Sequence, residues 1–155
     1  LPTNPRTDYI KRLVGLPGDR IQVREGVLSI NGQVVPRVKQ EDFEQEQPDG
    51  TPIAITRYRE TLPNGVSYDV LDSMPEGPLD NTPVYTVPAD HYFFMGDNRD
   101  SSQDSRVLEV VGYVPLENLV GRAEIVAVSF RQSLLKIWSW PASFRSNRAF
   151  TDLHH

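Results

Sequence analysis

The chain has 155 residues and a mass of 17.6 kDa, about the length of one domain. Its formal net charge of −5 argues against general binding to nucleic acid. Zero cysteines exclude disulfides, thiolate metal sites and cysteine nucleophiles. The sequence has neither an apolar run near the roughly 18 residues of a membrane span nor a signal peptide at its start. Because residue 1 is not Met, we expect a piece of a longer protein.

The first half of the chain alternates short apolar runs with turn signals, which predicts strands. We expect them at 9–15, 21–23, 27–30, 33–35, 53–60 and 66–71. Asn31-Gly32 predicts a tight hairpin because both residues accept a positive φ. A second hairpin is expected around Pro63-Asn64-Gly65. The polar stretch 38–51 contains five carboxylates and is interpreted as a mobile acidic loop.

The second half continues the strand pattern after a loop rich in Pro, Asp and Gly at 72–83. Further strands are expected at 84–87, 91–95, 107–114 and 121–130, with one helical turn at 116–119. The fold class is therefore mainly β, an antiparallel sheet core with an inserted, loop-rich β subdomain. The predicted division is a discontinuous core at 1–19 and 89–130, an insertion at 20–88, and a short helical, aromatic tail at 131–155.

The tail differs from the rest in charge and aromatic content. From residue 127 onward, four cations against Asp152 give +3, and both tryptophans lie there. Basic and aromatic residues together are typical of a segment at a membrane surface, although a tail packed on its own domain has the same composition. His154 and His155 are interpreted as the remnant of a purification tag and are left aside.

Lys11 lies in an apolar stretch, Tyr9-Ile-Lys-Arg-Leu-Val14. In a strand, Lys11 shares a face with Tyr9 and Leu13, so we expect it to be partly buried. Burial disfavours a charged lysine and lowers its pKa, and a neutral amine can act as a general base. The alternative is an exposed cation that protects an edge strand from aggregation.

A second chemically rich stretch runs from Met95 to Arg106 and follows a predicted strand. It contains three aspartates, two arginines and three serines. One interpretation is a tight turn held by Asp side chains and Arg–Asp pairs. The other is a preorganised loop that presents a hydroxyl to a catalytic group. The acids do not have the spacing of an EF-hand calcium loop.

Several other sites are disfavoured by the residues present. A Ser-His-Asp triad is disfavoured because His91 is the single histidine outside the terminal pair. One such histidine and no cysteine also argue against a metal site. The Gly-Leu-Pro-Gly stretch at 15–18 lacks the Lys-Ser/Thr of a phosphate-binding loop. We therefore expect no metal and no cofactor.

Taken together, the two stretches resemble bacterial type I signal peptidases. The motifs are Tyr9-Ile-Lys-Arg-Leu-Val-Gly-Leu-Pro-Gly-Asp19 and Gly96-Asp-Asn-Arg-Asp-Ser-Ser-Gln-Asp-Ser-Arg106. The resemblance covers about residues 8–129 and is weakest in the acidic middle. It implies a Ser/Lys endopeptidase that removes signal peptides from exported pre-proteins after Ala-X-Ala-like sites. It also implies a location at the inner membrane, with the catalytic domain on the periplasmic face.

The resemblance also assigns roles to individual residues. Lys11 would be the general base, and Ser102 would orient its amine. The edge formed by Asp8, Tyr9 and Ile10 would pair with an extended signal peptide. Supporting pairs that hold the loop against the strand would come from Arg12, Asp97, Asp104 and Arg106.

The family's nucleophile presents a departure from this pattern. It lies upstream of the lysine, in a Ser-Met-x-Pro motif after a membrane anchor, and the sequence has no such motif before Lys11. Asp72-Ser-Met-Pro75 is not a substitute, because its proline comes one place early and it follows the lysine. We therefore expect a fragment that keeps the base, lacks the nucleophile and anchor, and is inactive alone. The alternative is a non-catalytic relative that serves as a binding or assembly module.

Overall fold

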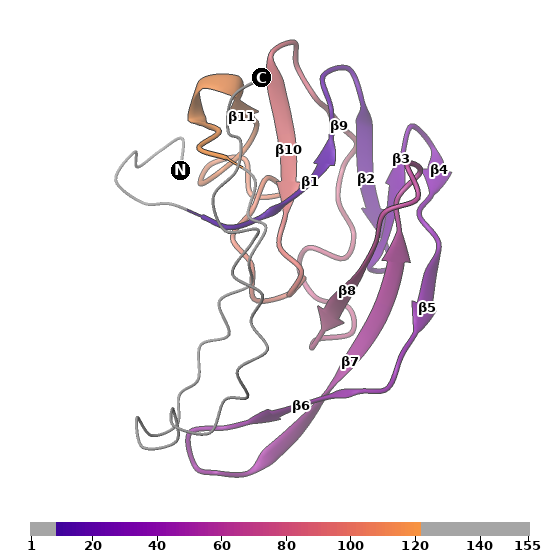
Figure 1. Ribbon diagram of the computed structural model, residues 1–155, viewed down its shortest axis with the longest axis vertical. Helices are drawn as coiled ribbons and strands as arrows, with labels where there is room; N and C mark the ends of the chain where they lie inside the picture. Colours follow the sequence, from indigo (N-terminus) through magenta and orange to yellow (C-terminus); the bar gives the residue numbers. More distant parts are fainter. Residues whose placement is uncertain (1–8, 122–155) are drawn as a thin grey trace, which may run out of the picture. The chain divides into compact units, whose positions relative to one another are not determined.

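The computed structural model describes residues 9–121, and the predicted strand at 121–130 and the tail at 131–155 lie outside this range except for Gly121. Figure 1 shows the described part as a succession of strands. They are β1 (Arg12–Gly15), β2 (Arg20–Arg24), β3 (Val27–Ile30), β4 (Gln33–Val34), β5 (Arg37–Lys39), β6 (Phe43–Glu46), β7 (Pro52–Thr61), β8 (Ser67–Asp72), β9 (Tyr85–Thr86), β10 (His91–Met95) and β11 (Val114–Pro115). One 3-10 turn, η1 (Leu116–Asn118), follows β11.

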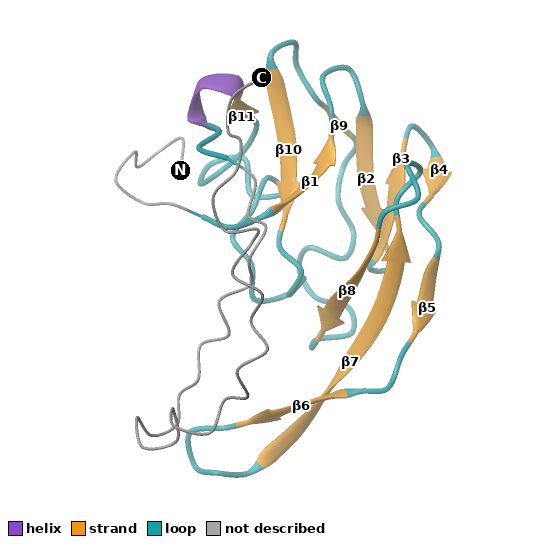
Figure 2. Ribbon diagram, in the orientation of Figure 1, coloured by secondary structure: helices purple, strands orange, loops and turns teal. Residues whose placement is uncertain are grey.

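All the strand pairs are antiparallel, which confirms the predicted mainly β class (Figure 2). The described strands form three sheets. Two have the orders β1-β10-β11 and β4-β3-β2-β9, and in the third β7 pairs with β5, β6 and β8. The first sheet uses only residues of the predicted core, and the other two only residues of the predicted insertion. One apolar cluster nevertheless contains side chains from all three sheets, including the buried Ile21, Val70 and Phe93.

Local turn chemistry explains why the strands begin and end where they do. Asn31 and Gly32 have φ values of 55° and 80°, the left-handed conformation that this hairpin requires, and Ile30 pairs with Gln33. Gly65 has a φ of 85° in the turn between β7 and β8. Both predicted hairpins are therefore confirmed.

The prediction of a loop over 38–51 is wrong where β5 and β6 lie, at 38–39 and 43–46. β5 and β6 follow one another along the same edge of β7, with Arg37 opposite Glu60 and Phe43 opposite Ile55. The pairing of β6 uses backbone groups, while all four of its side chains are exposed. Charged side chains can therefore remain in water while the chain is extended, and the acidic composition did not distinguish a strand from a loop.

The predicted strand at 107–114 is also wrong for most of its length. The amides of Val110, Val111 and Gly112 all donate to the Val107 carbonyl, so the backbone turns back on itself. Gly112 has a φ of 58°, which an extended strand does not allow. Of the predicted strand, only Val114 lies in an observed strand, β11 (Val114–Pro115). At the start of the chain, β1 begins at Arg12 rather than at residue 9.

Candidate functional site

The register between β1 and β10 brings the two sequence motifs together. Arg12 pairs with Met95 and Leu13 with Phe94. Continuing the same register, Lys11 stands opposite Gly96, the first residue of the loop 96–106. The antiparallel pairing therefore places the start of one motif beside the start of the other.

Gly96 shows how close Lys11 and Ser102 come. A Cβ atom at Gly96 would lie 1.9 Å from Ser102 Oγ and 3.5 Å from Lys11 Nζ. The hydroxyl and the amine therefore both lie near the place where residue 96 would carry a Cβ atom. The serine hydroxyl fits there only because residue 96 is a glycine. Any side chain at this position would occupy the place of the serine hydroxyl.

The two polar groups at this point have few partners of their own. Ser102 is 8% exposed, and its Oγ makes no hydrogen bond to the described residues. Lys11 is half-buried and forms no ion pair with residues 9–121. Its Nζ lies 5.2 Å from the centre of the Tyr9 ring, within the range of a cation–π contact.

Asp104 holds the loop 96–106 in shape. It is fully buried, and its carboxylate accepts hydrogen bonds from the Gly96 amide, the Arg106 amide and the Arg106 guanidinium. Arg106 also donates to the Arg99 carbonyl over 2.6 Å. Ser105 bonds to β10 twice, since its amide donates to the Phe94 carbonyl and its Oγ accepts from the Phe94 amide.

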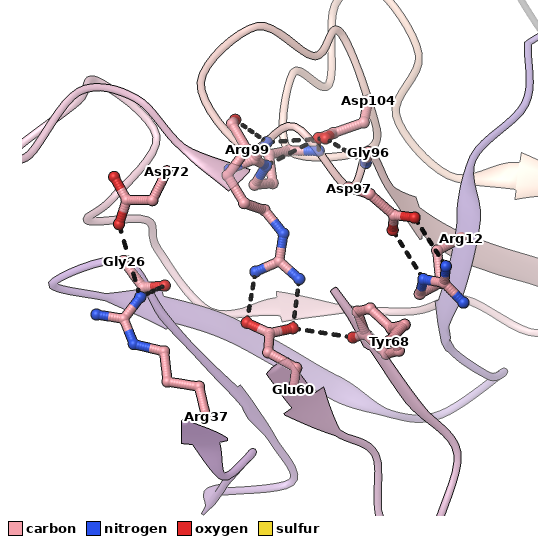
Figure 3. Close-up of polar contacts among 11 residues, drawn as sticks. Arg12, Gly26, Arg37, Glu60, Tyr68, Asp72, Gly96, Asp97, Arg99 and Asp104 are labelled. Atoms are coloured by element: carbon pink, nitrogen blue, oxygen red, sulfur yellow. Dashed lines mark hydrogen bonds and ion pairs between the residues drawn. The ribbon is translucent and has the colours of Figure 1, made fainter. Parts of the chain in front are cut away.

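Arg12 ties the loop to β1. Its Nε and Nη2 donate to the two oxygens of Asp97, each over 2.7 Å. This hydrogen bonding is the main reason that the pKa of Arg12 is raised, despite partial burial that acts in the opposite direction. Figure 3 shows this bidentate pair beside the cluster of Asp104 and Arg99. The structure therefore brings Arg12 to Asp97 and Arg106 to Asp104.

Of the three residues expected to contact a substrate, two lie in the described part of the chain. Tyr9 and Ile10 lie just before β1, and Ile10 is 83% exposed. Asp8 lies outside the described residues. Among the described strands, β1 pairs only with β10 and so forms an edge of its sheet.

Two further residues near the site were not found from the sequence. Glu60 and Tyr68, from β7 and β8, contact Arg99 of the loop 96–106 directly or through each other. Their positions in two half-buried strands gave no signal, because alternation predicts a face and not a partner.

Within residues 9–121 there is no group of three metal-ligating side chains. The same residues contain no helix with the length and hydrophobicity of a membrane span.

Comparisons with known proteins identify relatives of the whole chain. The family model described as "Signal peptidase, peptidase S26" matches residues 1–128. The chain is 36% identical over 170 residues to "Signal peptidase I" of Rickettsia bellii, covering 99% of this chain and 57% of the relative. It is 36% identical over 171 residues to "Signal peptidase I" of Rickettsia prowazekii, covering 62% of that protein. The chain thus spans about three fifths of the relatives' length.

A solved structure of a signal peptidase I from Enterococcus faecalis is also similar. It is 27% identical in sequence, and the match covers 76% of this chain and 85% of that one. The TM-score between the two structures is 0.39.

Proposed function

The chain belongs to the signal peptidase family, peptidase S26, and from this we propose that it is part of an enzyme that removes signal peptides from exported pre-proteins. The observation that carries the proposal is that Lys11 Nζ and Ser102 Oγ both lie within 3.5 Å of the place of a Cβ at Gly96. The bond cut is the peptide bond after an Ala-X-Ala-like site.

In this mechanism Lys11 is the general base of a Ser/Lys pair. Its neutral amine accepts the proton of a serine hydroxyl as that oxygen attacks the scissile carbonyl carbon. The resulting ammonium then donates a proton to the leaving amine, and water hydrolyses the acyl-enzyme ester. Lys11 forms no ion pair with residues 9–121, so no carboxylate of these residues occupies its amine.

Ser102 serves to orient this amine. Its buried hydroxyl has no hydrogen-bond partner among the described residues, and it has one hydrogen to donate and lone pairs to accept with. Lys11 Nζ lies nearby, 3.5 Å from the place of a Cβ at Gly96. Ser73 is a poor candidate for the nucleophile, since its hydroxyl donates to Asp100 over 3.2 Å. We propose that the nucleophile belongs to a Ser-Met-x-Pro segment outside these 155 residues, so that the chain alone has little or no activity.

The substrate lies along the edge of β1. An extended peptide adds to an unpaired strand edge through backbone hydrogen bonds, and alternate side chains then enter pockets that set specificity. The exposed Tyr9 and Ile10 lie at the end of β1 nearest to Lys11. Asp8 is proposed to extend this edge.

The proposed location is the inner membrane, with the site on its periplasmic face. Exported pre-proteins present their signal peptides there. The basic, aromatic tail at 131–155 would contact the membrane surface, whose anionic lipids attract such segments.

A cleavage assay tests the catalytic proposal. A peptide carrying an Ala-X-Ala site is incubated with the chain alone and with a Ser-Met-x-Pro peptide added in trans. We expect no cleavage by the chain alone and site-specific cleavage with the added segment. Lys11→Ala should abolish that cleavage, and Ser102→Ala should weaken it less, because it removes an orienting bond and leaves the base.

Lys39→Ala is the matched control, since Lys39 is an exposed lysine paired with Asp42 at 3.5 Å. It should cleave like the wild type. Cleavage by the chain alone would contradict the assignment of the nucleophile, and wild-type rates for Lys11→Ala would contradict the assignment of the base. No cleavage in either mixture would favour a non-catalytic binding or assembly module.

A further inference from the structure

Glu60 is a buried carboxylate to which the mechanism above assigns no role. It is 1% exposed in β7 and accepts hydrogen bonds from both terminal nitrogens of Arg99. The Tyr68 hydroxyl of β8 donates to the same carboxylate over 2.9 Å. A buried ion pair costs desolvation that its attraction barely offsets, so its value to the protein is in the geometry it specifies.

The contacts of Glu60 form part of a ring of side-chain contacts that closes through the loop backbone between Asp97 and Arg99. Tyr68, which is bonded to Glu60, has its ring face 3.9 Å from the Arg12 guanidinium carbon. Arg12 in turn holds Asp97, which precedes Arg99 by two residues in the loop. Figure 3 shows these five side chains facing one another from β1, β7, β8 and the loop 96–106.

Backbone contacts tie β8 to the same loop. The Leu71 amide donates to the Asp97 carbonyl over 2.8 Å, and the Arg99 amide donates to the Leu71 carbonyl over 2.9 Å. The hairpin of β7 and β8 therefore contacts the loop through the backbone of Leu71 and through the side chain of Glu60, to which Tyr68 donates a hydrogen bond. The loop residues contacted, Asp97 and Arg99, lie within five residues of Ser102.

The ring also reaches the opposite side of the site. Arg12 is the chain neighbour of Lys11 and the first residue of β1, so the ring includes the residue beside the amine. On the loop side, the Arg99 carbonyl accepts from Arg106, which holds Asp104, which in turn receives the Gly96 amide. The ring thus connects to the residues on both sides of the Lys11–Ser102 approach.

We propose that Glu60 and Tyr68 are positioning residues, through which the β7–β8 hairpin sets the placement of Ser102 against Lys11. Their relevance to catalysis rests on the proposed function. Tyr68 acts as a neutral hydroxyl, because burial and the adjacent Glu60 charge both raise its pKa. The Tyr68 hydroxyl can therefore donate a hydrogen bond to Glu60 while the face of its ring packs against the Arg12 guanidinium.

The test measures the local exposure of Lys11 in the full chain. The chain has three lysines, at 11, 39 and 136, and trace acetylation followed by mass spectrometry reports each of them separately. The variants are Glu60→Gln, which removes the charge, and Tyr68→Phe, which keeps the ring over Arg12 and removes only the hydroxyl. We expect the ratio of Lys11 to Lys39 acetylation to rise at least about twofold in both, as the loop loosens around the amine.

Asp69→Asn is the matched control on the same hairpin. Asp69 pairs with Arg59 at 2.8 Å across β7 and β8, in the register position next to Glu60 and Tyr68, but at an exposed site. It should leave the acetylation ratio unchanged. A general loss of stability would raise the labelling of Lys39 as well, whereas a positioning role changes the ratio.

The outcomes separate this proposal from the catalytic one. A raised ratio in either folded variant supports it, and if Glu60→Gln does not fold, Tyr68→Phe alone decides. Wild-type or lower ratios in the folded variants would overturn it. The labelling needs no turnover, so it remains decisive if the cleavage assay shows no peptidase, while Lys11→Ala tests the base without altering the ring.

Discussion

Replacing Gly96 by alanine is the sharpest test of how the site is built. The backbone at Gly96 does not have a positive φ, so alanine brings no conformational penalty of its own. Its Cβ would nevertheless lie 1.9 Å from Ser102 Oγ and 2.4 Å from Ser102 Cβ. Rotating the serine hydroxyl removes the first clash and leaves the second, so the loop backbone must move.

The size of the effect follows from the kind of strain. Forcing an extra methyl group into a packed site costs about 1–3 kcal/mol. For a chain of this length, that free energy lowers the melting temperature by roughly 3 °C per kcal/mol. We therefore expect Gly96→Ala to melt roughly 3–9 °C below the wild type.

The assay is thermal unfolding followed by circular dichroism, with Gly121→Ala as the control. Gly121 also lacks a positive φ, and no atom of the described residues lies within 4 Å of the Cβ it would receive. Alanine at 121 should therefore change stability by less than about 1 kcal/mol, with any gain coming from a less flexible unfolded chain.

A second substitution locates the clash. In the Gly96→Ala background, Ser102→Gly removes both clashing atoms and should recover stability, by a coupling of about 0.5–3 kcal/mol. Ser102→Ala keeps the Cβ at 2.4 Å and should recover little. Wild-type stability for Gly96→Ala, or equal recovery by the two second substitutions, would refute the reasoning.

Three further predictions concern the carboxylates. Asp104→Asn leaves the buried Arg106 charge without its partner and should cost about 3 kcal/mol or more in urea unfolding. Asp97→Asn breaks a partly exposed pair with Arg12 and should cost about 1 kcal/mol or less; an equal loss for the two variants would contradict this ranking. Asp72 has a raised pKa, chiefly from burial and then from two neighbouring carboxylates. A raised native pKa means that its contribution to stability falls as the pH rises above about 3.8, so Asp72→Asn should stabilise the protein at pH 7 and not at pH 3, measured by unfolding at both.

Local features of the sequence predicted local features of the fold. The hairpin at Asn31-Gly32 formed because two adjacent residues accept a positive φ, and no distant contact is needed for that. The strands at 27–30 and 91–95 followed from apolar runs bounded by turns. The motifs around Lys11 and Ser102 identified the family, because their letters are specific even without coordinates.

Sequence patterns failed where water or a turn competed with them. The acidic stretch was interpreted as a loop, yet β6 is extended with its side chains in solvent. The apolar stretch at 107–112 was interpreted as a strand, yet three amides converge on the Val107 carbonyl. Composition reports where side chains prefer to be, and a backbone can satisfy that preference in more than one conformation.

The sequence by itself therefore determined the family, the β class and the residue types of the site. Only the tertiary structure decided that Lys11 and Ser102 both come close to Gly96, through the register of β1 on β10. It also decided that Glu60 is buried against Arg99, a residue 39 positions away. The physical reason is that strand alternation assigns each side chain to a face, whereas register and long-range pairing determine which groups on those faces come into contact.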